Sequence, residues 1–432
     1  MKSEGLMSNV IRLHPDREPV GQFIRVGRGY SQLDALFGSG RLRLDRAVFN
    51  AGAVERQRDL LNALQAKHYE VVLDTTVAEL SVVGRFEGAC SRAPWAVSGR
   101  PLVPSDIEQS SFAEKIARFA VKDNFSAVLS PTHFISAAND PLFLTDRKAC
   151  INLRAALDKE GGRNIGLDYV LALPNRVLKD PAQRAVILQK LSGLPFENLW
   201  LRVSQFGADA TGLGVRRYIE ATQEIAQFDH PIIIDGVAGL AALAVIAFGA
   251  AGGVAHGVGD MERFDASDWN TPPKEKGGFG LPTRVLVPAL DRQLTRKQFD
   301  AIMAAPGGRK AILCSDVDCC PRGLPDMWQD PKAHYLYQRR RPLENLSNVP
   351  NLRRAQHFID FELAAVERKA RAFARLKISD SETAKLVSKE STRLERFSPI
   401  LEHLHDMGMP GQRSIAPRFR ASNAPPDQRA QL

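Results

Sequence analysis

The sequence predicts an α/β fold, namely a TIM (β/α)8 barrel followed by a basic helical C-terminal extension. Short β-rich runs alternate with amphipathic helices through residues 44–259, which is typical of a parallel sheet. The runs are almost continuously apolar, so both faces of the sheet are expected to be covered. Seven strand–helix units are visible by residue 259, and eight units in about 250 residues close a barrel. An open doubly wound sheet is the competing architecture.

The expected strands are the runs richest in β-branched and aliphatic residues, at 44–52, 70–77, 125–134, 164–174, 198–206, 230–239 and 252–259. The helix before the second strand places Leu60, Leu61 and Leu64 on its inner face. Asp180 followed by Pro181 predicts the first turn of a later helix. The segment "AILCSDVD" at 311–318 is the candidate for the eighth strand, after an irregular excursion at 260–295.

These elements divide the chain into a barrel at 40–325, a basic helical extension at 326–408, and disordered ends at 1–20 and 409–432. The extension is helical because Phe358, Ile359, Val366 and Phe373 form one apolar stripe, with Arg and Lys opposite. The final residues are rich in Pro, Arg and Ser, a composition typical of disorder.

Charge is distributed unevenly along the chain. The net charge is +9, and residues 284–432 carry 26 basic and 17 acidic residues, so the whole excess lies in the C-terminal third. This asymmetry favours a surface for RNA or DNA, although a solvated basic helix face would look the same. The sequence leaves open whether the protein forms a homo-oligomer.

The location expected is the cytoplasm. No apolar run of about 18 residues is present, and the N-terminal residues lack the apolar core of a secretory signal. Five cysteines, an odd number, argue against a disulfide framework.

Polar side chains follow four of the expected strands, where a barrel carries its active site. They are Asp74, Gln205, Asp235, and the pair Asp316 and Asp318. Carboxylates from different strands can converge on one substrate as acid/base and nucleophile. The alternative is that each Asp caps the helix that follows it.

Glycines cluster after the last two strands of the regular series, at Gly236, Gly239, Gly257 and Gly259. Glycine lets backbone amides approach a ligand closely, and loops after late barrel strands often hold phosphate. Tight packing of the chain against itself is the alternative explanation.

A group of metal-ligand residue types lies near the candidate eighth strand. Cys314, Cys319, Cys320 and His334 provide enough ligands for a tetrahedral zinc site. Their spacing matches no standard zinc knuckle, and buried free cysteine is common. A structural zinc ion is therefore one of two interpretations.

Several segments together resemble the tRNA-guanine transglycosylase superfamily, TIM-barrel enzymes that exchange a base in nucleic acid through a covalent aspartyl intermediate. "VVLDTTVAEL", "LDYVLALP", "LRVSQFG", "IIIDGVAG", "VAHGVG" and "SDVDCCPR" are similar to its strand-end segments, and residues 334–361 are similar to its basic helical segment. The resemblance covers roughly residues 70–375.

The resemblance implies roles for particular residues. Asp74 corresponds to an acid/base aspartate, Asp168 to a base-recognising aspartate, and Gln205 to a base-contacting glutamine. Asp318 corresponds to the nucleophile that attacks C1′ of a nucleoside, with Asp316 as its neighbour. The glycines at 236, 239, 257 and 259 correspond to residues lining the pocket.

Two other functions compete with this one. Residues 232–259 also look like the last two strands of FMN- or nucleotide-binding phosphate barrels, which would make the protein an oxidoreductase or a nucleotide-processing enzyme. That reading ends the barrel at 259 and places "AILCSDVDCC" in an appended domain. A non-catalytic nucleic-acid-binding barrel is the remaining alternative.

Overall fold

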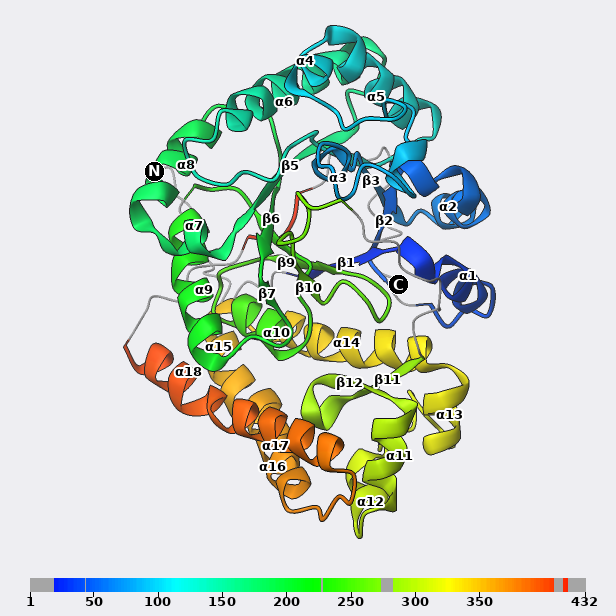
Figure 1. The fold of residues 1–432 in the computed structure, drawn as a ribbon, viewed down its shortest axis with the longest axis vertical. Helices are drawn as coiled ribbons and strands as arrows, with labels where there is room; N and C mark the ends of the chain where they lie inside the picture. The colour runs from blue at the N-terminus through cyan, green and yellow to red at the C-terminus, as the bar shows by residue number, and fades with distance from the viewer. Residues whose placement is uncertain (1–18, 43, 227, 273–282, 408–414, 419–432) are drawn as a thin grey trace, which may run out of the picture.

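The computed structural model describes residues 19–42, 44–226, 228–272, 283–407 and 415–418 and contains a closed, all-parallel barrel of eight strands (Figure 1). The predicted TIM barrel is therefore confirmed, as is the helical C-terminal region. In barrel order the strands are β1 (Gly21–Arg25), β2 (Arg46–Asn50), β3 (Glu70–Asp74), β4 (Ala127–Leu129), β5 (Gly166–Pro174), β6 (Leu199–Ser204), β8 (Ile232–Asp235) and β9 (Gly253–His256).

Helices cover the outside of the barrel between the strands. The longer ones are α1 (Tyr30–Gly38), α2 (Arg58–Ala66), α5 (Ser110–Lys122), α6 (Leu142–Lys159), α8 (Pro181–Leu191), α9 (Gly212–Ala226) and α10 (Gly239–Ala247). Short helices are α3 (Val77–Leu80), α4 (Pro104–Ile107) and α7 (Asn175–Lys179). Helix α2 buries Leu60, Leu61 and Leu64, and the Asp180 carboxylate accepts two amides at the start of α8, both as predicted.

Two strand assignments made from the sequence are wrong. The first barrel strand is β1, ahead of the predicted 44–52 strand, and β9 pairs with β1 to close the barrel. Residues 311–318 form no strand, because α12 (Gly308–Ile312) ends there and a turn follows. Strand β1 escaped detection because its five residues include Gln22, which faces outward, and Arg25, which faces inward, and both interrupt the expected apolar run.

The barrel therefore ends at His256, well before residue 325, and a second unit follows it (Figure 1). It contains the hairpin β11 (Arg284–Val287) and β12 (Arg292–Thr295), then α11 (Arg296–Ala304), α12, α13 (Leu324–Gln329) and α14 (Pro331–Ser347). The helices α15 (Arg354–His357), α16 (Ala364–Ala374), α17 (Ser381–Glu395) and α18 (Phe397–Asp406) complete it, with a π-helical turn at Phe358–Leu363. The hairpin, α11 and the cysteines share a core of their own, separate from the barrel core.

The predicted irregular excursion at 260–295 folds back onto the barrel. Its short strand β10 (Arg263–Phe264) pairs with β7 (Phe206–Gly207), and the amide of Gly84 donates to the carbonyl of Trp269 at 2.7 Å. The excursion thereby covers part of the C-terminal end of the barrel; residues 273–282 lie outside the described part.

The predicted disordered ends fall largely on residues 1–18, 408–414 and 419–432, which lie outside the described residues. Residues 415–418 are described and lie against the N-terminal end of the barrel. There Asn198 donates to the carbonyl of Arg418 at 2.8 Å and accepts the Arg418 amide at 2.7 Å. Among the described residues, no helix combines the length and the apolar character that crossing a membrane requires.

The barrel interior is layered. Phe23, Val72, Trp200 and Ile233 belong to one buried apolar cluster. Because side chains two apart on a strand share a face, the next inward residues toward the C-terminal end are Arg25, Asp74, Arg202 and Asp235. An apolar middle layer thus supports a charged layer at the end where barrel enzymes bind substrates.

Candidate active site and candidate metal centre

Two arginines and two aspartates form a buried network at the C-terminal end of the barrel. Arg25 donates to Asp235 from Nε at 2.7 Å and from a terminal nitrogen at 2.6 Å, and to Asp74 at 2.5 Å. Arg202 donates to Asp235 at 2.8 Å and to Asp74 at 3.2 Å. Each carboxylate therefore bridges both guanidinium groups, which come from strands on different sides of the barrel.

Glu79, on α3, is the fifth charged member of this group, which we call the rim cluster (Arg25, Asp74, Glu79, Arg202 and Asp235). Its Oε1 accepts from Arg202 at 3.2 Å, whereas its Oε2 is buried and has no hydrogen-bond partner among the described residues. The nearby hydroxyl of Thr76 is also buried without a partner there, and Thr76 has a positive φ of 53°. Unpartnered buried groups and backbone strain in one place are typical of a functional site.

The two carboxyl groups that share Arg202 have pKa values shifted in opposite directions. Burial opposes ionisation of Asp74, but the charges of Arg25 and Arg202 outweigh it and lower its pKa to about 2. Burial raises the pKa of Glu79, and the charge of Asp74 adds to this increase against the attraction of Arg202. At neutral pH Asp74 is therefore a fixed carboxylate, whereas Glu79 is the member that carries a proton most readily.

The charge count explains this division. Two guanidinium groups balance Asp74 and Asp235, so ionised Glu79 would leave the rim cluster with one surplus negative charge. Protonation of Glu79 makes the cluster neutral. Asp74 and Asp235 were identified from the sequence, whereas Arg25, Arg202 and Glu79 were missed. The available signal was an arginine at an inward position of an otherwise apolar strand, as in "LWLRVS".

Asp168 lies inside the barrel below the rim cluster, toward the N-terminal end, where its partner Asn198 also contacts Arg418. It is the third residue of β5 and accepts hydrogen bonds from Asn198 at 2.7 Å and from the Trp200 indole at 2.8 Å. Burial raises its pKa to about 7, although both hydrogen bonds oppose the increase. The structure therefore does not bring Asp168 together with the rim cluster, and its partners are residues of the barrel itself.

Gln205 does lie at the C-terminal end, directly after β6. Its side chain is exposed, its φ is +68°, and its amide donates to the carbonyl of Phe264 at 2.8 Å. A left-handed backbone at a non-glycine residue beside the rim cluster is consistent with a site at this end.

The glycines expected to cradle a phosphate are approached by the chain itself. The amide of Leu240, the second residue of α10, donates to the Asp291 carboxylate at 3.0 Å, so a carboxylate of the chain itself already occupies this helix N-terminus. A Cβ on Gly239 would collide with the same carboxylate, and one on Gly236, whose φ is +78°, would lie 2.9 Å from Phe264. The structure therefore gives no support to an FMN- or phosphate-binding site at these loops.

Gly257 and Gly259 are used in the same way. A Cβ on Gly257 would collide with Asp260, and the carbonyl of Gly259 accepts from Gln293 at 3.1 Å. Close packing of the chain against itself, the alternative weighed from the sequence, accounts for both.

Asp316 and Asp318 are not at the barrel end, and their placement on an eighth strand is wrong. Asp318 is exposed in the turn after α12. Asp316 pairs with Arg341 and accepts the amides of Asp318 at 3.0 Å and Cys319 at 3.2 Å. The sequence between Cys314 and Cys320 alternates polar and apolar residues like a strand end, but its polar groups shape a turn.

That turn brings together Cys314, Cys319, Cys320 and His334, a group that could hold a metal ion. Their ligand atoms all lie within 4.8 Å of one another and all four residues are buried. His334 Nδ1 lies 3.2 Å from the Cys319 sulfur and 3.3 Å from the Cys320 sulfur, and the two sulfurs are 3.7 Å apart. Ligands of one tetrahedral ion have separations of this size, since metal–ligand bonds are about 2.0–2.3 Å long.

A second layer of contacts orients the group. Nε2 of His334 lies 2.9 Å from the carbonyl of Leu286 and donates to it, which leaves the Nδ1 lone pair facing the sulfurs. Gln338 donates to the sulfur of Cys314 at 3.6 Å. The group thus joins the β11 hairpin, the turn after α12 and helix α14.

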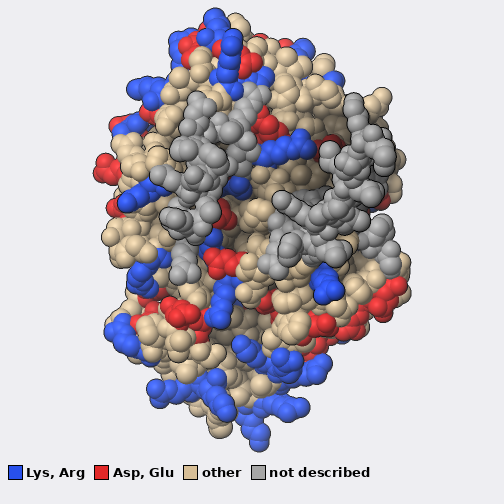
Figure 2. Space-filling model, turned by 180° about the vertical axis from the view of Figure 1, so that it is seen from behind, with Lys and Arg blue, Asp and Glu red and all other residues tan. Residues whose placement is uncertain are grey.

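The positive excess of the C-terminal third gathers at one end of the molecule. Figure 2 shows Lys and Arg crowded at the end formed by α12, α16 and α17. There the exposed side chains of Arg309, Lys310, Arg375 and Lys377 form no ion pair with any described residue. We call these four residues the basic end; it is a surface of uncompensated positive charge.

The comparisons with known proteins identify no family for this chain. No protein-family model and no curated protein matches the chain in sequence. Distant matches among solved structures include the xylanase 10B CBM22-1–GH10 modules of Clostridium thermocellum (14% identity, TM-score 0.37), covering 56% of this chain and 59% of that one. Others are the type I 3-dehydroquinate dehydratase of Clostridium difficile (9%, 0.36; 60% and 92%) and a GH26 β-mannanase from Bacteroides ovatus (11%, 0.36; 60% and 86%). Similarity this low carries no inference about activity.

Proposed function

We propose that this protein is a transglycosylase-like enzyme that exchanges or removes a guanine-type base in nucleic acid, with its chemistry at the rim cluster. The observation that carries the proposal is that Asp74 and Glu79 share Arg202 while their pKa values shift in opposite directions. A pair of carboxyl groups whose pKa values are shifted apart supplies one ionised carboxylate and one proton donor. The resemblance of the strand-end segments to the transglycosylase superfamily supports the choice of base.

The reaction breaks the bond between C1′ and the base nitrogen. Glu79 donates its proton to the departing base, and Asp74 forms an ester bond to C1′ through a carboxylate oxygen. An incoming base or water then displaces Asp74 and returns a proton to Glu79. Among the described residues, Asp74 Oδ1 accepts a hydrogen bond only from the Thr76 amide, at 2.8 Å, so this oxygen keeps a lone pair for the attack on C1′. Asp74 thus takes the nucleophile's role that the sequence suggested for Asp318.

We further propose that Cys314, Cys319, Cys320 and His334 bind a structural zinc ion. Three thiolates and one imidazole form a closed tetrahedral set, with no position left for substrate. The ion would fix the β11 hairpin to α14 and would supply folding free energy rather than chemistry.

The basic end supports nucleic acid as the partner. Four uncompensated cations on neighbouring elements would release counterions on binding a phosphate backbone. The Arg375→Glu/Lys377→Glu variant should weaken binding at low salt and reduce the salt slope, whereas a matched Lys115→Glu/Lys122→Glu variant, on α5 at the other end of the molecule, should change both less.

Covalent trapping tests the chemistry. The full chain is incubated with guanine-containing RNA or DNA and a 7-deazaguanine analogue, then separated under denaturing conditions. We expect a covalent adduct that is lost in Asp74→Asn and retained in Asp318→Asn. Circular dichroism confirms that both variants are folded.

A pH profile tests Glu79 separately. Glu79 acts only when protonated, so the rate of base release should fall as pH rises through its raised pKa. In Glu79→Gln, the rate should no longer show this decrease with pH. An adduct that persists in Asp74→Asn would refute the proposed nucleophile. Salt-sensitive binding with neither adduct nor base release would instead identify a non-catalytic nucleic-acid-binding barrel.

A further inference from the structure

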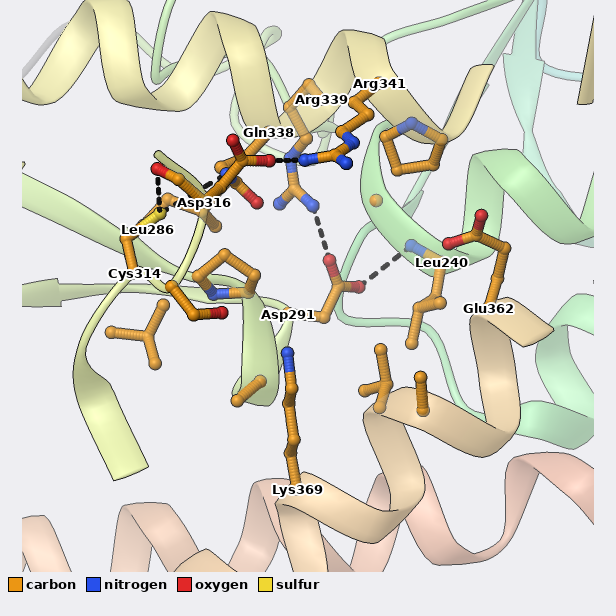
Figure 3. Close-up of a pocket in the computed structure, with 18 of the residues that line it drawn as sticks. Leu240, Leu286, Asp291, Cys314, Asp316, Gln338, Arg339, Arg341, Glu362 and Lys369 are labelled. Atoms are coloured by element: carbon orange, nitrogen blue, oxygen red, sulfur yellow. Dashed lines mark hydrogen bonds and ion pairs between the residues drawn. The ribbon is translucent and has the colours of Figure 1, made fainter. Parts of the chain in front are cut away.

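A large cavity lies between the barrel and the C-terminal unit, away from the rim cluster; Cys314 of the candidate metal centre lies in its wall. Its volume is about 870 Å³, which is in the range of cavities that hold drug-sized ligands. Its walls come from α10, the end of β11, α12, α14 and α16, and Figure 3 shows their side chains converging on one space.

The walls are mostly apolar. Leu240 and Leu243 of α10, Leu286 of β11, and Leu343 of α14 are all buried and line the cavity. Apolar walls of this kind favour a molecule with a substantial hydrocarbon or aromatic body.

Most of the charged groups in the walls already have partners. Asp291 pairs with Arg339 at 2.5 Å and also accepts the Leu240 amide of α10. Asp316 pairs with Arg341, as the dashed contact in Figure 3 shows. These four residues therefore contribute little net charge to a ligand.

Two lysines in the walls are not compensated. Lys310 of α12 and Lys369 of α16 form no ion pair with any described residue, and α12 packs against α16. Lys369 extends from its helix into the cavity (Figure 3). The remaining carboxylate, Glu362, accepts from Asn345 at 3.0 Å and lies two helical turns from Lys369, about 10 Å along the axis.

We propose that this cavity binds an amphipathic anion: an apolar molecule with one terminal carboxylate or phosphate. The apolar body lies against α10 and α14, and the anionic group lies between Lys310 and Lys369. This site is independent of base exchange, since none of the rim cluster residues lines it.

The test is saturable binding of 1-anilinonaphthalene-8-sulfonate, an aromatic anion, to the folded full chain. The Ala365→Trp/Ala372→Trp variant places two indoles beside Lys369, on an incompletely buried helix face, and should weaken binding more than 10-fold. Lys310→Gln/Lys369→Gln should weaken it about 2- to 30-fold, the range for two partly exposed ion pairs. Lys385→Gln/Lys389→Gln, on α17 and outside the cavity, is the matched control and should bind like the wild type.

Decanoate and decyl phosphate then compete with the probe, and the stronger competitor identifies the anionic group. Unfolding midpoints measured by circular dichroism confirm that each variant is folded. Absence of saturable binding to the wild type, or unchanged binding in a folded Ala365→Trp/Ala372→Trp variant, would overturn the proposal.

Discussion

Replacing Asp235 with asparagine removes the carboxylate that holds both arginines of the rim cluster. Asp235 is 0% exposed and accepts three hydrogen bonds, at 2.7, 2.6 and 2.8 Å, from Arg25 and Arg202. Asparagine keeps the shape but leaves two buried guanidinium groups sharing Asp74. Breaking a buried ion pair by removing one partner typically costs about 3–5 kcal/mol. We therefore expect the free energy of unfolding at pH 7 to fall by that amount.

Urea unfolding followed by circular dichroism measures this loss. Asp265→Asn is the control, because Asp265 is exposed and lies 4.0 Å from Arg263, so its loss should be under about 1 kcal/mol. Combining Asp235→Asn with Arg202→Met restores the charge balance, so the double variant should lose less than the two single variants together.

The effect should also depend on pH in a defined direction. Burial opposes ionisation of Asp235, but the charges of Arg202 and Arg25 outweigh it and lower its pKa. Its stabilising contribution is therefore present above the unfolded pKa of about 4 and disappears as pH falls through the lower folded value. A loss below about 1 kcal/mol at pH 7 would show that the network does not stabilise the barrel.

Three further predictions concern other parts of the chain. Cys319→Ser should abolish binding of one zinc ion per chain and lower the unfolding midpoint, as measured by elemental analysis and thermal denaturation; a zinc-free wild type would contradict this. Gly252→Ala should displace residues 415–418, because the new Cβ would collide with the carbonyl oxygen of Ile415. Limited proteolysis near the C-terminal end should therefore be faster in this variant. Gly38→Ala, whose Cβ has open space around it, should leave the rate of proteolysis unchanged. The pKa of Asp168 is about 7 in the folded protein, so the free energy of unfolding should decrease as pH rises from about 4 to 7. Asp168→Asn should remove that decrease. An unchanged pH profile in the variant would refute the raised pKa.

The sequence determined the fold class, the two aspartates of the rim cluster and all four residues of the candidate metal centre. Alternating apolar runs and helices predict a covered parallel sheet, and the inward face of each strand follows from its period of two. Asp74 and Asp235 were found because each ends an apolar run, and Cys314, Cys319, Cys320 and His334 were found because their chemistry is that of metal ligands.

Only the tertiary structure decided which segments close the barrel and which charges meet. Polar Gln22 and Arg25 interrupt the five residues of β1, so no apolar run marks it as a strand, and its neighbours β2 and β9 are about 20 and 230 residues away in sequence. Asp168 and Asp74 share the inward face, yet Asp168 is hydrogen-bonded to Asn198 and Trp200 rather than to the arginines of the rim cluster, which the sequence alone does not show. Arg202 and Asp235 are already opposite each other on paired strands. The ion pairs of Arg25 with Asp235 and of Arg202 with Asp74 depend on barrel closure, because only the closed barrel brings these residues close in space.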